Sequence, residues 1–278
     1  MNETATGQTT RIALLNPNTS TSMTERMLAA AHATSAPGIE IEPLTASRGV
    51  PYISSYAEAQ IGGTVALESI AERLERDDDG GGVDAVVIAA FGDPGVKAAR
   101  ELFDLPVVGI AAAAAVTAAL LGERFAIVTF TPLMSRWYLD CIASVGLGAR
   151  CTGVRAPAPR AFDVDGVAES MADELAELAR HCVVDDGADV VILGGAPLAG
   201  LAPAIQHAVP APLIDPVTAA VGQAATLARC ASRSALRARH RRPVAKPSTG
   251  LSPALARVIV EGGNDAAARA GESDRRER

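Results

Sequence analysis

The stretch that decides the fold is DAVVIAAFGDPG, residues 84–95, because its first half recurs later in the chain. Residues 189–195 read DVVILGG and match DAVVIAA position by position, beginning 105 residues after it. Each run is apolar, rich in β-branched residues, and ends in small residues before a turn with proline. This pattern is typical of a buried parallel strand. The repetition predicts two similar α/β halves related by a pseudo-twofold axis.

Strand-like and helix-like segments alternate from residue 11 to about residue 230. The alternation predicts an α/β fold with two homologous doubly wound parallel-sheet domains, flavodoxin-like, and a cleft between them. Two long helices are predicted in the second half, at Asp165–Val184 and Pro197–Ala208. The predicted organisation is a disordered N-terminus at 1–10, a first half at 11–117 plus 216–230, a second half at 118–215, and a mostly disordered basic tail at 231–278. Within the tail, Ser252–Glu261 could form one helix.

Charge and composition restrict the class of protein. The chain has 49% hydrophobic residues and a formal net charge of −7, although residues 231–278 carry eleven Lys/Arg against five Asp/Glu. The acidic remainder argues against nucleic acid as the main partner. The first ten residues lack the apolar core of a signal peptide, and no apolar run is long enough to cross a membrane. Cys141, Cys151, Cys182 and Cys230 form no CxxC pair, which favours a cytoplasmic protein with reduced thiols and without zinc.

The two repeated strands locate the expected site. Ligands of doubly wound sheets bind beyond the carboxyl ends of the strands, so Ala90 and Gly195 should lie on opposite walls of one cleft. A symmetric pair there suits removal of a proton from one face of a carbon and its return to the other. That reaction needs two acid–bases, typically thiols or carboxylates. Ala90 and Gly195 supply neither, and their small size predicts an enlarged cleft.

Polar residues near the strand ends are candidates for substrate binding. The loop containing Asn16, Asn18, Thr19 and Ser20 could cradle a carboxylate or an imide oxygen with its amides and hydroxyls. Thr129 and Thr131, in VTFTP, could supply further donors. In both segments the alternative is capping of the helix that follows. The remaining candidates adjoin the repeated strands: Ala90, Phe91, Gly92, Gly195 and Ala196.

Three residues are candidates for moving a proton. Asp93 could be an acid–base in the cleft, although Asp before Pro94 is also a common N-cap of a helix, here one predicted at Gly95–Phe103. Tyr52 and Tyr56 follow the second strand and could line or close the cleft, with simple packing as the alternative.

Six stretches together resemble a known family. They are IALLNPNTS (12–20), YISS (52–55), AFGDPG (90–95), AIVT (126–129), LGGA (193–196) and IDPV (214–217). In order and spacing the chain resembles the aspartate/glutamate racemase superfamily, within it the hydantoin and allantoin racemase branch, over residues 11–230. The resemblance implies a cofactor-free site between two homologous domains, and a homo-oligomer. It also implies a catalytic cysteine at the positions held by Ala90 and Gly195, and a glutamate near Ala112. Arylmalonate decarboxylases of this superfamily keep one such cysteine, whereas this chain has neither.

Three functions remain open at this point. The favoured one is a cofactor-independent enzyme on a racemase scaffold, an isomerase or lyase. It would act on a small carboxylate or cyclic amide by non-thiol isomerisation, elimination or cyclisation. The alternatives are a hydantoin or amino-acid racemase with an unrecognised base, and a non-catalytic ligand-binding pseudoenzyme. All three require a small-molecule ligand and no nucleic acid, membrane or metal. Ala90 could be natural or an engineered replacement of a cysteine.

Overall fold

The computed structural model describes residues 9–76, 82–239 and 243–260, and it contains two parallel four-stranded sheets. The first sheet has the order β2-β1-β3-β4 and the second the order β6-β5-β7-β8. The strands are β1 (Thr10–Asn16), β2 (Ile39–Thr45), β3 (Ala85–Ile88), β4 (Val107–Gly109), β5 (Phe125–Val128), β6 (Cys151–Arg155), β7 (Val190–Leu193) and β8 (Leu213–Ile214). The identical order in both sheets confirms the predicted α/β class and its two homologous halves.

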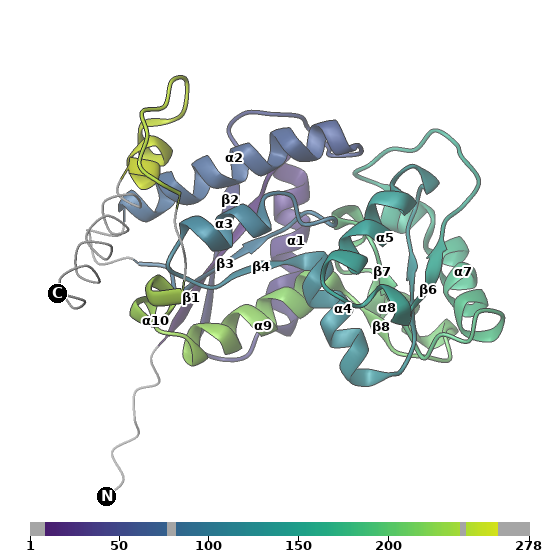
Figure 1. Ribbon diagram of the computed structural model, residues 1–278. Helices are drawn as coiled ribbons and strands as arrows, with labels where there is room; N and C mark the ends of the chain where they lie inside the picture. The colour runs from purple at the N-terminus through teal and green to yellow at the C-terminus, as the bar shows by residue number, and fades with distance from the viewer. Residues whose placement is uncertain (1–8, 77–81, 240–242, 261–278) are drawn as a thin grey trace, which may run out of the picture.

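Helices cover both faces of each sheet (Figure 1). They are α1 (Thr21–Thr34), α2 (Tyr56–Glu75), α3 (Val96–Leu102), α4 (Ile110–Leu121), α5 (Ser135–Ser144), α6 (Val167–Ser170), α7 (Ala172–Val184), α8 (Ala202–Ile205), α9 (Pro216–Cys230) and α10 (Arg233–Arg239). As a result every residue of β3 and β7 is buried. This explains why the repeated strands are continuously apolar rather than alternating.

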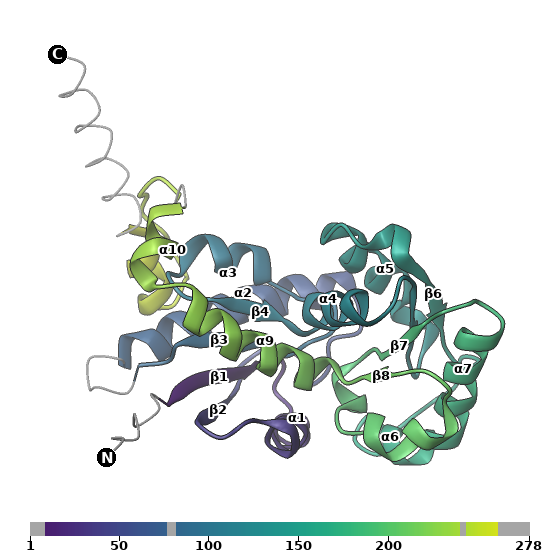
Figure 2. The same ribbon diagram turned by 90° about the horizontal axis from the view of Figure 1, so that it is seen from below.

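The two halves exchange one helix each. α4 follows the first sheet in sequence but packs on β5, β7 and β8, whereas α9 follows the second sheet and packs on β1, β3 and β4. The predicted boundary at residues 117–118 therefore falls inside α4. Figure 2 shows α4 and α9 together on the underside of the molecule, and Gln223 of α9 donates hydrogen bonds to the Ala113 carbonyl and the Thr117 hydroxyl of α4, both at 2.9 Å. The helix pair ties the halves together on this side.

Two predicted helices are wrong in their extent. The helix predicted at Asp165–Val184 is interrupted at Met171, where Ser170 Oγ donates to the Gly166 carbonyl and so competes with the helical hydrogen bonds. The helix predicted at Pro197–Ala208 is reduced to α8 between two 3₁₀ turns. Pro203 explains this difference, because proline lacks an N–H and is tolerated only in the first turn of a helix.

The prediction of a mostly disordered tail is wrong at Arg233–Arg239, which form α10, whereas the helix expected within Ser252–Glu261 is present at residues 253–260. α10 buries Leu236, and a further helix at residues 253–260 buries Ala254 and Leu255 against the first half. At the other end, Thr10 already belongs to β1. Residues 1–8 and 261–278 lie outside the described part of the chain. None of the helices in the described residues is long and apolar enough to cross a membrane.

The contact between α2 and α3 leads to a stability prediction. Gly95 has φ +79° at the start of α3, and a Cβ there would lie 2.9 Å from Gly63 Cα of α2. Gly95→Ala should therefore lower the free energy of unfolding by about 2–3 kcal/mol, through backbone strain and overpacking. Gly222→Ala in α9 is the matched control, since a Cβ there meets nothing within 4 Å. It should stabilise by about 0.5–1 kcal/mol. Urea unfolding of both variants checks the pair, and equal effects would contradict it.

Candidate active site

The carboxyl ends of β3 and β7 meet at one small pocket. Ala90 and Phe91 after β3 face Gly195, Ala196 and Pro197 after β7. The remaining lining residues come from the β1–α1 segment, the β2–α2 loop and α5: Asn18, Met23, Tyr52, Ile53, Trp137 and Tyr138. The structure thus brings together six residues named from the sequence: Asn18, Tyr52, Ala90, Phe91, Gly195 and Ala196. It leaves the other candidates outside the lining: Asn16, Thr19, Ser20, Tyr56, Gly92, Asp93, Thr129 and Thr131.

The pocket is nearly full. Its volume is about 20 Å³, which is room for a single water molecule. Aromatic rings occupy the space, with Phe91 and Tyr138 edge to face at 4.6 Å between centroids and Tyr52 beside Phe130 at 6.2 Å. The expectation of an enlarged cleft is therefore wrong, because rings from both halves fill the volume that small residues leave at the two strand ends. A ligand can enter only when these rings move.

Gly195 is adapted to the absence of a side chain. Its φ is +127°, and a Cβ at this position would lie 2.9 Å from Phe130 Cε1 and 3.6 Å from the Tyr138 hydroxyl. The phenol of Tyr138 therefore stands where a side chain at position 195 would point. Sequence reasoning missed Tyr138 and its neighbour Trp137, both on α5. Their helical spacing with the buried Cys141 and Ile142 is typical of a helix face in the core, and nothing else in the sequence indicates that they line a site.

A half-buried phenol, Tyr52, and a buried one, Tyr138, converge on one weak acceptor. The hydroxyls of Tyr52 and Tyr138 each donate to Met134 Sδ at 3.4 Å. Burial raises the pKa of both tyrosines well above their usual value near 10. Both phenols therefore stay protonated at neutral pH, so they can donate hydrogen bonds to a ligand oxygen but cannot act as bases. A thioether sulfur is a poor partner that a ligand oxygen could replace with a gain in hydrogen bonding.

Thr129 adds a third hydroxyl beneath Tyr138. It is completely buried, and within the described ranges its Oγ1 has no hydrogen bond of normal geometry. Its proximity to Tyr138 lowers the pKa of that phenol by less than burial raises it. Thr131 caps the turn that follows it, which was the alternative to substrate binding, since its Oγ1 accepts from the Leu133 amide at 3.4 Å.

The loop of residues 16–20 uses most of its polar groups internally. Asn16 Nδ2 donates to Asn18 Oδ1, the Ser20 carbonyl and Thr24 Oγ1 at 2.9–3.1 Å. Ser20 Oγ accepts from the Met23 amide and caps α1, and the Thr19 amide donates to the Val50 carbonyl. The side-chain amide nitrogen of Asn18 has only Met23 Sδ at 3.9 Å as a partner among the described residues. Asn18 is therefore a donor of this loop that both lines the pocket and remains available to a ligand.

Asp93 caps a helix, but not the one expected. Its Oδ1 accepts from the Ala111 amide at 2.9 Å and its Oδ2 from the Ala112 amide at 2.8 Å, so it caps α4 rather than α3. The Cys141 thiol donates to Oδ2 at 3.7 Å. Burial raises the pKa of the Asp93 carboxyl to about 6, against the opposing effect of the two amides. Asp93 thus sits behind the pocket, and its carboxylate is committed to α4.

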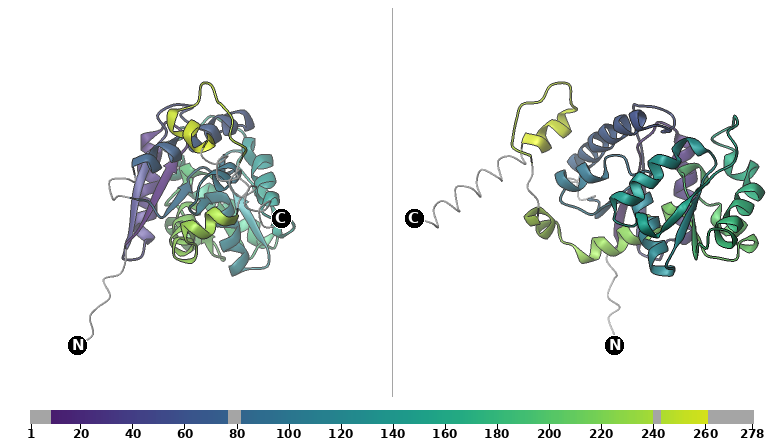
Figure 3. Two further views of the ribbon diagram at one scale, coloured as in Figure 1. Left: turned by 60° about the vertical axis from the view of Figure 1, so that its left-hand side comes forward. Right: turned by 45° about the vertical axis from the view of Figure 1, so that its right-hand side comes forward.

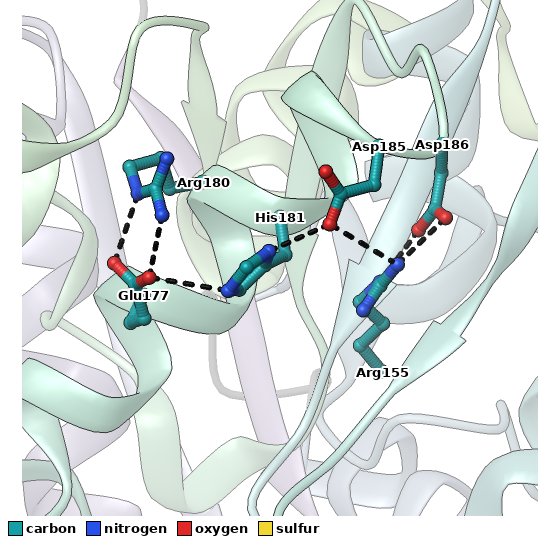
Figure 4. A network of polar contacts seen from close by, with 6 residues as sticks. All are labelled: Arg155, Glu177, Arg180, His181, Asp185 and Asp186. Carbon is teal, nitrogen blue, oxygen red and sulfur yellow. Dashed lines mark hydrogen bonds and ion pairs between the residues drawn. The ribbon is translucent and has the colours of Figure 1, made fainter.

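The other titratable candidates lie away from the pocket. Tyr56 is 49% exposed, and its hydroxyl donates to Asp140 of α5 at 2.6 Å. His181 belongs to the surface network of Figure 4, between Glu177 at 3.1 Å and Asp185 at 2.6 Å. The four cysteines are free, and the lining contains none of them. Across the described ranges, no three His, Cys, Asp or Glu side chains are placed to hold a metal ion.

Comparisons with known proteins agree on one family. Residues 12–224 match the family model described as Asp/Glu/Hydantoin racemase. The chain is 34% identical over 220 residues to a hydantoin racemase of Paenarthrobacter aurescens, covering 78% of this chain and 90% of that protein. It is 31% identical over 217 residues to a hydantoin racemase of a Pseudomonas species, covering 78% and 85%. Among solved structures, an allantoin racemase from Klebsiella pneumoniae superposes with a TM-score of 0.77 at 32% identity, over 88% of this chain and 98% of that one.

The two strand ends should respond differently to a cysteine. Gly195→Cys should cost about 2–3 kcal/mol, because the new Cβ meets Phe130 and the backbone is left-handed. Ala90→Cys should cost less than about 1 kcal/mol, since Ala90 already carries a Cβ and lines the pocket. Denaturant unfolding of the single variants measures both values. Equal costs would show that the second strand end is not built around a missing side chain.

Asp93 should make stability depend on pH in the acidic range. Its folded pKa of about 6 exceeds the unfolded value of 3.8, so the folded protein binds the proton more tightly. The resulting stabilisation is complete below about pH 4 and is lost as the pH rises through about 6. Between pH 7 and 4.5, the wild-type protein should gain about 2 kcal/mol relative to Asp93→Asn. Parallel unfolding curves across this range check the difference, and a constant difference would contradict the assignment.

Proposed function

The chain belongs to the Asp/Glu/hydantoin racemase family, and from that premise we propose that it racemises a hydantoin-type cyclic amide without a thiol. The ligand would lie between Ala90 and Gly195. The observation that carries the proposal is the pair of protonated phenols, Tyr52 and Tyr138, aimed at one weak acceptor beside the second strand end. A five-membered cyclic amide presents a carbonyl oxygen next to an acidic C–H, and such an oxygen can replace the Met134 contact.

The chemistry requires stabilisation of an enolate. When the proton at ring carbon 5 leaves, negative charge develops on the adjacent carbonyl oxygen. Two phenols in a site closed to bulk water would stabilise that charge, and such donors are typically worth about 10²–10³ in rate. One water molecule enclosed with the ligand would accept the proton, and reprotonation from either face of the planar enolate would give racemisation. A positioned general base usually contributes about 10²–10⁴ more, so the expected reaction is slow.

Access to the pocket depends on the contact between the β2–α2 loop and α5. Tyr52 lies on the loop and contacts Met134 just before α5, and Tyr56 at the start of α2 is bonded to Asp140 within α5. Separation of these two segments would admit a ring-sized ligand, and their return would exclude water. The same closure would place Tyr52 and Tyr138 on one ligand oxygen.

A second candidate function is ligand binding without catalysis. One observation favours it: the pocket lining contains no carboxylate, thiol or imidazole. The two candidates differ in a single step, since both require the ligand to bind and only the first requires the C–H proton to exchange. The sequence alone favoured a different non-thiol reaction on this scaffold. That hypothesis has less support than racemisation, because the relatives are named hydantoin and allantoin racemases. A cytoplasmic location and a homo-oligomer stay predictions.

Deuterium uptake in D₂O should separate these functions. The wild-type protein should speed exchange at carbon 5 of 5-substituted hydantoins above the buffer rate, and Tyr138→Phe should lower that increment by about tenfold or more, because it removes an enolate donor. Tyr52→Phe should act in the same direction. Proton NMR with each ligand measures both exchange and binding.

Cys230→Ser and iodoacetamide treatment serve as controls. Cys230 is the exposed cysteine of the chain, so neither change should alter the exchange rate if no thiol takes part. Binding without exchange would establish the non-catalytic function. Neither binding nor exchange would show that the hydantoin class is wrong, and loss of exchange on alkylation would show that a thiol acts.

A further inference from the structure

The C-terminal segment 251–260, here named the strap, lies outside the region that the family model matches, which ends at residue 224. It packs alongside α2 of the first half, as the yellow helix in Figures 1 and 3 shows. Its sequence, LSPALARVIV, places apolar residues on one helical face: Leu251, Ala254, Leu255, Val258 and Ile259. All five pack on the core cluster that includes Ile70 of α2 and Leu102 of α3. The strap is therefore a docked element with a defined seat.

The strap contacts a buried acidic residue of α2. Glu68 is only 7% exposed. Its Oε1 accepts from the Ser252 amide of the strap at 3.4 Å, and its Oε2 accepts from Arg48, whose Nε lies at 3.0 Å. Within the described part of the chain these are its two hydrogen-bonding partners. About two helical turns further along α2, Arg257 of the strap forms an ion pair with Glu75.

Arg48 belongs to the loop that forms one wall of the pocket. Two residues on, the Val50 carbonyl accepts from the Thr19 amide at 3.0 Å, next to the pocket residue Asn18. Tyr52 and Ile53 of the same loop line the pocket directly. At its far end the loop is held by Glu58, which accepts from the Ser54 amide at 2.7 Å. The Arg48–Glu68 pair thus fixes the near end of the segment that carries Tyr52.

We propose that the strap acts as a positioning element, which keeps the β2–α2 loop closed over the pocket through Glu68 and Arg48. The physical basis is solvent access. The Glu68 carboxylate is sheltered from water, although the Arg48 side chain is 55% exposed. An ion pair with one sheltered partner is screened less than a pair in which both side chains are exposed. Release of the strap exposes Glu68 to water, weakens its hold on Arg48, and frees the loop to withdraw Tyr52 from Met134. Undocking of the strap therefore shifts the β2–α2 loop toward the open position.

The positioning role of the strap concerns the same site as the proposed function, and its meaning for a hydantoin ligand rests on that function. The test itself needs no ligand, so the two can fail separately. Trp137 is the one tryptophan of the sequence and lines the pocket. Its fluorescence quenching by acrylamide reports pocket opening, and hydrogen exchange of amides 47–53 reports the loop.

Three variants of the full chain test the linkage. Leu255→Asp places a charge in the seat of the strap. It should raise the quenching constant of Trp137 about twofold and speed exchange at amides 47–53 about tenfold, as local opening does. Arg48→Gln should do the same while the strap amides 253–260 keep their protection. Arg48→Lys, which retains the charge, should restore most of the wild-type quenching.

Val260→Asp is the matched control, because it adds the same charge to the strap at a position that is 43% exposed and lies outside the core cluster. It should leave the Trp137 quenching unchanged. The proposal is overturned if amides 253–260 lose protection in Leu255→Asp while Trp137 and amides 47–53 behave as in the wild-type protein. It is also overturned if Arg48→Gln leaves both reporters unchanged, a result that does not depend on whether Leu255→Asp folds. Equal changes in Val260→Asp would overturn it as well, because they would show that the added charge acts without undocking the strap.

Discussion

Close packing of aromatic rings onto small residues at the strand ends is the constraint on which the site depends. Phe130 lies against Gly195, and Trp137 lies so near Gly92 that a Cβ there would stand 2.3 Å from its ring. The rings come from the second half and reach the ends of both central strands. They determine the volume of the pocket, the position of the Tyr138 phenol and the exclusion of side chains from position 195. A racemase scaffold with two thiols removed would leave empty space, and this pocket has almost none.

The corresponding helices of the two halves, α4 and α9, are capped by carboxylates from different places in the chain. The helix after the fourth strand of the second half, α9, is capped by Asp215, which accepts from the Val217 and Thr218 amides. The corresponding helix of the first half, α4, begins after Gly109 and receives its carboxylate from Asp93 instead. A side chain at Gly109 would collide with that carboxylate, since its Cβ would lie 2.2 Å from Asp93 Cγ. Asp93, the acidic residue beside the first strand end, therefore has a structural role and is not free to act as a base.

The repeat at residues 84–90 and 189–195 is enough to predict the sheets, their parallel strands and the meeting of Ala90 with Gly195, because these follow from local pattern and chain symmetry. The partner of Asp93 was not predictable, since α4 lies 17 residues or more away and its approach is tertiary. Tyr138 and Trp137 were missed because a functional aromatic on a helix has the same spacing as a core residue. The helix of the strap was expected within Ser252–Glu261, but its packing on α2 was not, because that contact is tertiary.

The geometry also fixes the side on which the molecule can open. α4 and α9 tie the halves on the underside through Gln223, while on the opposite side the β2–α2 loop meets α5 through Tyr52 and Tyr56. A third contact, Arg26 of α1 with Glu169 of α6, is partly exposed and so contributes little to holding the halves together. Opening is therefore expected to pivot about α4 and α9 and to part the loop from α5. The strap grips α2 and, through Glu68, the loop itself, so it acts at the edge that moves rather than at the pivot. An added segment can thus influence a pocket that it never touches.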